Sequence, residues 1–109
     1  MSAPHGDWWW SDRWGWVFSP TVTVGWRPFL RGHWVFTDDG WVWESPEPFA
    51  WACYHYGRWV FLDDAGWTWI PGRTWSPSVV EWRRGPGVIG WAPLPPAGVV
   101  LVDFGWVFV

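Results

Sequence analysis

Apolar and polar positions alternate along two stretches of the chain, residues 32–43 and 57–69. Each stretch carries a β-prone run on either side of a short polar segment, with no 3.6-residue periodicity across it. The polar segments are Asp38-Asp39-Gly40 and Asp63-Asp64-Ala65-Gly66, which are typical of tight turns because aspartate bonds to nearby backbone and glycine accepts positive φ. The pattern therefore predicts two antiparallel hairpins. Glycine residues upstream of each hairpin indicate a further turn, so each unit is expected to be a three-stranded meander.

The hairpin pattern recurs along the chain with a period of about 25 residues. Gly-Trp pairs mark the repeat, and their tryptophans are spaced by 25, 26 and 24 residues: Trp16, Trp41, Trp67 and Trp91. Proline-rich joints separate the units, which we place at residues 8–25, 26–50, 51–74 and 75–98, followed by C-terminal strand residues 99–109. We therefore expect one all-β domain over residues 1–109, with about eight to ten short antiparallel strands in a compact sandwich, barrel or short solenoid.

Alternation along the expected strands gives each hairpin two apolar faces. One face of the second unit carries Trp34, Phe36, Trp41 and Trp43, and the third unit repeats it with Trp59, Phe61, Trp67 and Trp69. The opposite face carries valine and threonine. One face is expected to pack inside the domain, and the other to meet a ligand, a neighbouring sheet or another subunit.

The ordered series of Trp motifs between residues 25 and 96 resembles a bacterial Trp-rich domain of unknown function, often found downstream of FecR-like domains in exported proteins. The matching segments are Gly25-Trp26-Arg27-Pro28-Phe29, Gly32-His33-Trp34-Val35-Phe36-Thr37, Trp51-Ala52-Cys53-Tyr54-His55-Tyr56-Gly57-Arg58-Trp59, Gly66-Trp67-Thr68-Trp69-Ile70-Pro71-Gly72 and Gly90-Trp91-Ala92-Pro93-Leu94-Pro95-Pro96. The resemblance implies a cell-envelope or extracellular setting and brings no catalytic residues. The first residues show no signal peptide, and no apolar run has transmembrane length. A weaker resemblance is to choline-binding cell-wall repeats.

Tryptophan dominates the composition, but its abundance alone does not require an exposed binding face. The chain has 17 Trp, 7 Phe and 2 Tyr among its 109 residues. A chain of this size buries about 12,000 Å² on folding. At about 200 Å² for each aromatic residue, these side chains need only about 5,000 Å² of that burial. A binding face must therefore be argued from residue positions.

Charge and residue types exclude several classes of function. The net charge is −3, and all seven basic residues are arginines without a basic stripe, which argues against nucleic-acid binding. Cys53 is the only cysteine, so neither a disulfide nor a cysteine zinc site is expected. The paired aspartates are explained by turns, and the three histidines do not repeat with the units. No catalytic site, metal or cofactor is expected.

Two non-enzymatic functions remain. The first is a structural or assembly module that self-associates through aromatic faces and strand edges into a homo-oligomer or filament. The edge candidates are Trp8, Trp9, Trp10, Phe104, Trp106 and Phe108, because residues 99–109 are β-prone and must pair within the fold or with another copy. The alternative is a module that binds carbohydrate or cell-wall polymer on Trp platforms. The candidate ligand or partner residues are Trp41, Trp43, Trp67, Trp69, Tyr54, Tyr56 and Arg58.

Overall fold

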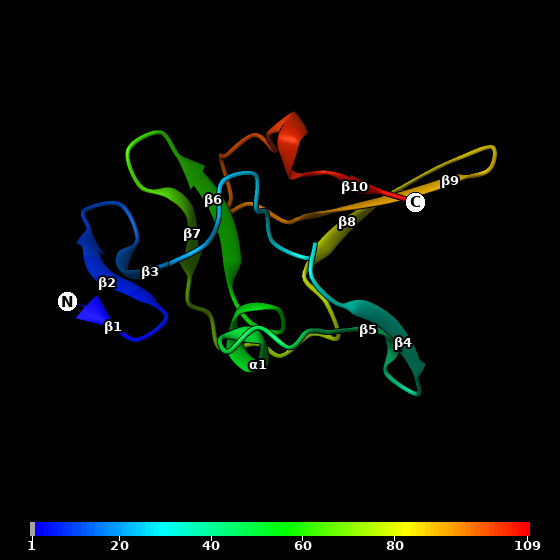
Figure 1. Ribbon diagram of the computed structural model, residues 1–109, viewed down its shortest axis with the longest axis horizontal. Helices are drawn as coiled ribbons and strands as arrows, with labels where there is room; N and C mark the ends of the chain where they lie inside the picture. Colours follow the sequence, from blue (N-terminus) through cyan, green and yellow to red (C-terminus); the bar gives the residue numbers. More distant parts are fainter. Residues whose placement is uncertain (1) are drawn as a thin grey trace.

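The computed structural model describes residues 2–109 and confirms an all-β fold (Figure 1). Its strands are β1 (Ser2–Ala3), β2 (Gly6–Ser11), β3 (Gly15–Pro20), β4 (His33–Thr37), β5 (Gly40–Glu44), β6 (Arg58–Leu62), β7 (Gly66–Ile70), β8 (Val80–Gly85), β9 (Val88–Pro93) and β10 (Val107–Phe108). Two short helical elements interrupt them, α1 (Ala50–Cys53) and the 3-10 turn η1 (Asp103–Gly105). The described chain measures 42 × 27 × 27 Å along its principal axes.

Each expected unit contributes one antiparallel hairpin: β2–β3, β4–β5, β6–β7 and β8–β9. The turns are the predicted ones, and Gly40 and Gly66 adopt positive φ values of 101° and 73°. In the first of these turns the Thr37 hydroxyl makes the side-chain bonds, donating to the Gly40 carbonyl at 2.9 Å and accepting from the Asp39 N–H at 3.1 Å. The side-chain hydrogen bonds of this turn therefore come from threonine, where the sequence led us to expect them from aspartate.

The expected third strand of each meander is absent from the described residues. Trp26 lies in the loop after β3, Trp51 lies in α1, and Trp75 lies in the irregular segment before β8. Prolines such as Pro28 and Pro77 flank these segments and cannot donate to a strand ladder. These tryptophans therefore project from loops or a helical turn, and the repeating unit is a two-stranded hairpin.

The register confirms the faces predicted from alternation. Trp34 lies opposite Trp43 across β4 and β5. The equivalent pair in the third unit is Trp59 with Trp69. Directly opposed residues share one face of an antiparallel pair. Both faces of β6–β7 are buried, because Trp59 and Trp69 on one side and Val60 and Thr68 on the other are almost inaccessible.

The hairpins form three sheets, and sheet partners are not always neighbours in sequence. The largest sheet has the order β1-β2-β3-β7-β6, so the first and third units pair directly, through Phe18 opposite Trp69. The second sheet has the order β10-β9-β8, and the third is β4–β5 alone. None of the sheets closes into a barrel, and the pairing of the first unit with the third departs from solenoid stacking.

The C-terminal segment pairs within the fold, one of the two outcomes expected for it. Val107 and Phe108 of β10 lie opposite Trp91 and Gly90 of β9. Two backbone bonds between Ile89 and Val109, 3.1 and 2.9 Å long, extend this ladder to the last residue. Only these last residues are extended, because residues 99–106 form a loop and η1.

One aromatic core joins the three sheets. Tyr54 and Phe29, both fully buried, pack with ring centroids 4.5 Å apart. Buried indoles donate to backbone carbonyls: Trp59 to Cys53 at 2.9 Å, and Trp91 to Phe29 at 2.8 Å. Each close pair of aromatic rings, such as Phe29 with Tyr54, adds about 0.5–1.5 kcal/mol of stability beyond the effect of the area that it buries. Much of the tryptophan content is therefore structural.

Candidate functional site: an aromatic cleft between two hairpins

An aromatic cleft of about 390 Å³ opens between the hairpins β4–β5 and β8–β9, which diverge on the C-terminal side of the molecule (Figure 1). This volume falls within the usual range for small-molecule sites, about 300–1,000 Å³. The cleft is lined by residues of the second and fourth units: Trp34, Trp41, Trp82, Arg84, Ile89 and Trp91.

Strand register places these side chains together. Trp82 lies opposite Trp91, and Arg84 lies opposite Ile89, so all four project from one face of β8 and β9. Trp34 packs onto this face, with its ring centroid 4.6 Å from that of Trp82 and 5.5 Å from that of Trp91. The contacts between the indoles therefore fix the angle between the two hairpins and the shape of the cleft.

The cleft has a buried floor and two exposed walls. Trp91 is only 6% exposed and forms part of the floor, whereas Trp41 is 49% exposed and Trp82 is 39% exposed. Arg84 is the one charged residue of the lining and is itself exposed. The cleft therefore offers flat aromatic surfaces with a single guanidinium donor, which can bind planar apolar faces and hydrogen-bond acceptors.

The structure separates the seven candidate ligand residues. Trp41 lies in the cleft, Tyr56 is half-buried, and Arg58 is exposed on β6. The other four lie in the core: Trp43, Trp67, Trp69 and Tyr54. The candidate tryptophans therefore do not form one open platform, because Trp43, Trp67 and Trp69 are buried in the core.

Sequence reasoning did not select five members of the cleft: Trp34, Trp82, Arg84, Ile89 and Trp91. The signal for the three tryptophans was present, since Trp91 belongs to a repeated Gly-Trp pair and Trp34 and Trp82 each precede such a pair's tryptophan by seven to nine residues. What the sequence lacks is the information that the second unit packs onto the fourth. The candidate tryptophans Trp41, Trp43, Trp67 and Trp69 instead come from the second and third units.

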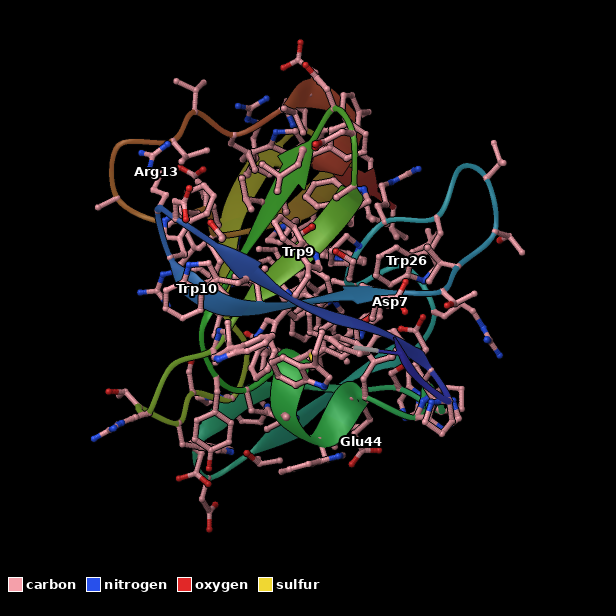
Figure 2. All side chains as sticks on the ribbon, turned by 90° about the vertical axis from the view of Figure 1, so that its left-hand side faces the viewer. Asp7, Trp9, Trp10, Arg13, Trp26 and Glu44 are labelled. Atoms are coloured by element: carbon pink, nitrogen blue, oxygen red, sulfur yellow. The ribbon has the colours of Figure 1, made fainter. Side chains whose placement is uncertain are left out.

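The assembly-edge candidates also divide by exposure. Trp10, Phe104 and Phe108 are each more than half exposed, whereas Trp106 is buried and Trp8 and Trp9 are half-buried. Trp9 and Trp10 project from opposite sides of β2 (Figure 2), and the Trp9 indole donates to the Ser19 hydroxyl at 2.9 Å. Only part of each candidate edge is therefore available to another molecule.

A buried carboxylate is the second chemically distinctive feature. Glu47, just before α1, is 6% exposed. Its Oε2 accepts from the Trp26 indole at 2.6 Å, and its Oε1 accepts from the Ser45 hydroxyl at 3.1 Å and from the Tyr54 hydroxyl. Burial, together with the neighbouring Glu47 charge, raises the pKa of Tyr54, which holds the phenol as a donor. Sequence reasoning missed this cluster because its members come from three unrelated segments.

Other reactive side chains have local structural explanations. Burial raises the pKa of the Cys53 thiol, which keeps it protonated and unsuited to nucleophilic attack. His33 lies 3.3 Å from Glu44 on the surface, and the His55 ring stacks on Trp75. Within residues 2–109, His, Cys, Asp and Glu form no group of three or more that would suit a metal ion.

A comparison with protein families shows which family the chain belongs to. A model described as a family of unknown function, DUF6600, matches residues 2–98. The chain belongs to DUF6600. No curated protein matches it significantly, and neither does any solved structure. In the described part of this DUF6600 chain, no helix has the length and apolar character to cross a membrane.

Proposed function

We propose that this domain is a non-enzymatic module that binds an extended carbohydrate chain in the aromatic cleft. The observation that carries the proposal is the pair of partly exposed indoles, Trp41 and Trp82, facing one cleft above the Trp34–Trp91 floor. The sequence alone favours self-association, and the cleft reverses that preference.

The chemistry of the lining favours sugars over other ligands. The C–H faces of a pyranose ring pack on indole faces, and Arg84 can donate to ring hydroxyls or to a sugar carboxylate. A quaternary ammonium ligand also suits aromatic cages, but the Arg84 guanidinium repels a cation. Single-stranded nucleic acid is disfavoured by the net charge of −3.

A cell-envelope setting belongs to the same proposal. The Trp-motif series resembles domains of exported bacterial proteins, and a polysaccharide ligand is abundant in such a setting. Under this proposal the repeat is a Trp-rich scaffold that positions a glycan-binding cleft at the bacterial surface. Fractionation of the native host, followed by immunoblotting, tests this placement separately from ligand binding.

Binding is tested by isothermal titration calorimetry with soluble oligosaccharides and by co-sedimentation with insoluble cell-wall polymers. We expect Trp82→Ala to weaken binding at least tenfold, which corresponds to about 1.4 kcal/mol. The matched control is Trp16→Ala, which removes an indole of similar exposure, 54%, from the first hairpin. Absence of binding to every polymer, or equal losses in the two variants, would refute the proposal.

Self-association is the second candidate, and the free edge of β8 favours it. In the described chain no strand lies beyond β8, and exposed aromatic side chains lie near both ends of the molecule, including Trp10 and Phe108. Unpaired edges readily accept a strand from another copy. Sedimentation velocity over a wide concentration range should then show oligomers, whereas a monodisperse monomer at the highest concentration would exclude this candidate.

A further inference from the structure

A second pocket, of about 290 Å³, lies apart from the aromatic cleft and includes Glu47 in its mixed polar and apolar lining. Its walls come from the turn between β1 and β2, the loop after β3, the residues before β4 and the segment before α1. The polar residues of its lining are His5, Thr21, Thr23, Trp26, Arg31 and Glu47. None of these residues lines the aromatic cleft.

Glu47 retains acceptor capacity in this pocket. A carboxylate offers about four acceptor positions. Two donors occupy Oε1, the hydroxyls of Ser45 and Tyr54, but only the Trp26 indole donates to Oε2. Trp26 and Glu47 both line the pocket, and the second acceptor position of Oε2 is the one that no described donor fills. A buried anion with hydrogen bonds alone is less stable than one that also meets a cation.

Arg31 brings the opposite charge to the same pocket. It is exposed, and among residues 2–109 neither Arg31 nor Glu47 forms an ion pair. The guanidinium and the carboxylate therefore line one pocket without neutralising each other. A ligand that carries both charges can satisfy both groups at once, with an ammonium at Glu47 and a carboxylate at Arg31.

The surface beside the pocket selects the rest of the ligand. An apolar hollow of about 220 Å³ adjoins it and shares Pro4, His5, Pro48 and Phe49 with its lining. The other walls of this hollow include Phe18 and Trp69. An apolar side chain attached between the two charged groups of a ligand would reach this hollow.

We propose that this pocket binds an apolar α-amino acid as its zwitterion. The ammonium donates to Glu47 Oε2, the carboxylate accepts from the Arg31 guanidinium, and the side chain packs in the apolar hollow. The site is independent of carbohydrate binding in the cleft, so either proposal can fail without the other.

The test compares leucine with two analogues that each lack one charge, N-acetyl-leucine and leucinamide, by calorimetry and ligand-observed NMR. We expect leucine to bind at least tenfold more tightly than either analogue. Arg31→Gln should remove the preference for leucine over leucinamide, because only the carboxylate contact is lost. The matched control is Arg73→Gln, an exposed arginine that does not line either hollow.

Glu47→Gln should weaken leucine and leucinamide together, since both present an ammonium. Thermal melting of this variant shows whether it is folded, and if it is not, the exposed Arg31→Gln variant carries the test alone. Leucine that fails to bind at millimolar concentration would overturn the proposal. Equal binding of leucine and both analogues would overturn the proposal as well, because such a result would show that the pocket does not recognise the two charges.

Discussion

Replacing Tyr54 with phenylalanine removes one hydroxyl from the centre of the core and leaves the ring in place. Tyr54 is fully buried, and its hydroxyl donates to Glu47 Oε1. A hydrogen bond to a charged group contributes about 1.5–3 kcal/mol, more than a neutral one, because burial hinders water from replacing the lost donor. For a domain of about 100 residues this corresponds to a fall in Tm of about 6–12 °C.

The assay is urea unfolding followed by circular dichroism, with thermal melting as a second measurement. Tyr56→Phe is the matched control, because Tyr56 is half-buried and its hydroxyl has no protein acceptor among residues 2–109. We expect the control to lie within about 0.5 kcal/mol of the parent. If the two variants are equally stable, the hydrogen bond from the Tyr54 hydroxyl to Glu47 does not stabilise the fold.

Three further predictions concern the backbone and the buried acids. Gly57→Ala should destabilise by about 3 kcal/mol or more, because a Cβ there would lie 2.0 Å from the Ile70 carbonyl oxygen at a φ of +69°. Gly40→Ala, at a φ of +101° with open space around it, should lose only about 1–2 kcal/mol, so similar urea midpoints for the two variants would contradict the clash. Burial raises the pKa values of Cys53 and Tyr54 in the folded state, so their contribution to stability is full at neutral pH and declines above about pH 8.5, where the unfolded thiol ionises first. Cys53→Ala should flatten this alkaline decline in urea midpoint, and an unchanged slope would argue against it. Native Cys53 should also resist thiol reagents at pH 8, and rapid labelling without unfolding would show that it is accessible.

The hairpins could be predicted from the sequence because their determinants are local. Alternation over five residues on each side of an Asp-Gly turn determines the β4–β5 register, and the structure has the predicted pairs. The prediction of a third strand in each meander was wrong because it rested on the glycine turn upstream of each hairpin, and such a turn does not require a strand before it. Trp51 lies between Pro48 and Cys53 in a segment that forms a helical turn instead.

The candidate site was predicted only in part, since it depends on which hairpin packs onto which. Trp41 was selected, but apart from Trp34 its partners in the cleft come from β8 and β9, about 40 to 50 residues further along the chain. The Glu47 cluster depends in the same way on Trp26 and Tyr54, which no spacing rule connects. Contacts of this kind arise from the whole core and leave no periodic signal in the sequence.

The order of the hairpins has a consequence for how such a chain can change in length. The first hairpin extends the sheet of the third, through Phe18 and Trp69, while the second packs on the fourth through Trp34 and Trp82. Sheet pairing therefore joins the odd units and the indole contacts of the cleft join the even ones, while the common core joins all four. A solenoid can gain or lose one repeat at its end, because every unit meets the same neighbour. Here the loss of any one hairpin would remove the strand partner or the ring contacts of the hairpin two units away, so a single repeat could not be lost without exposing part of another.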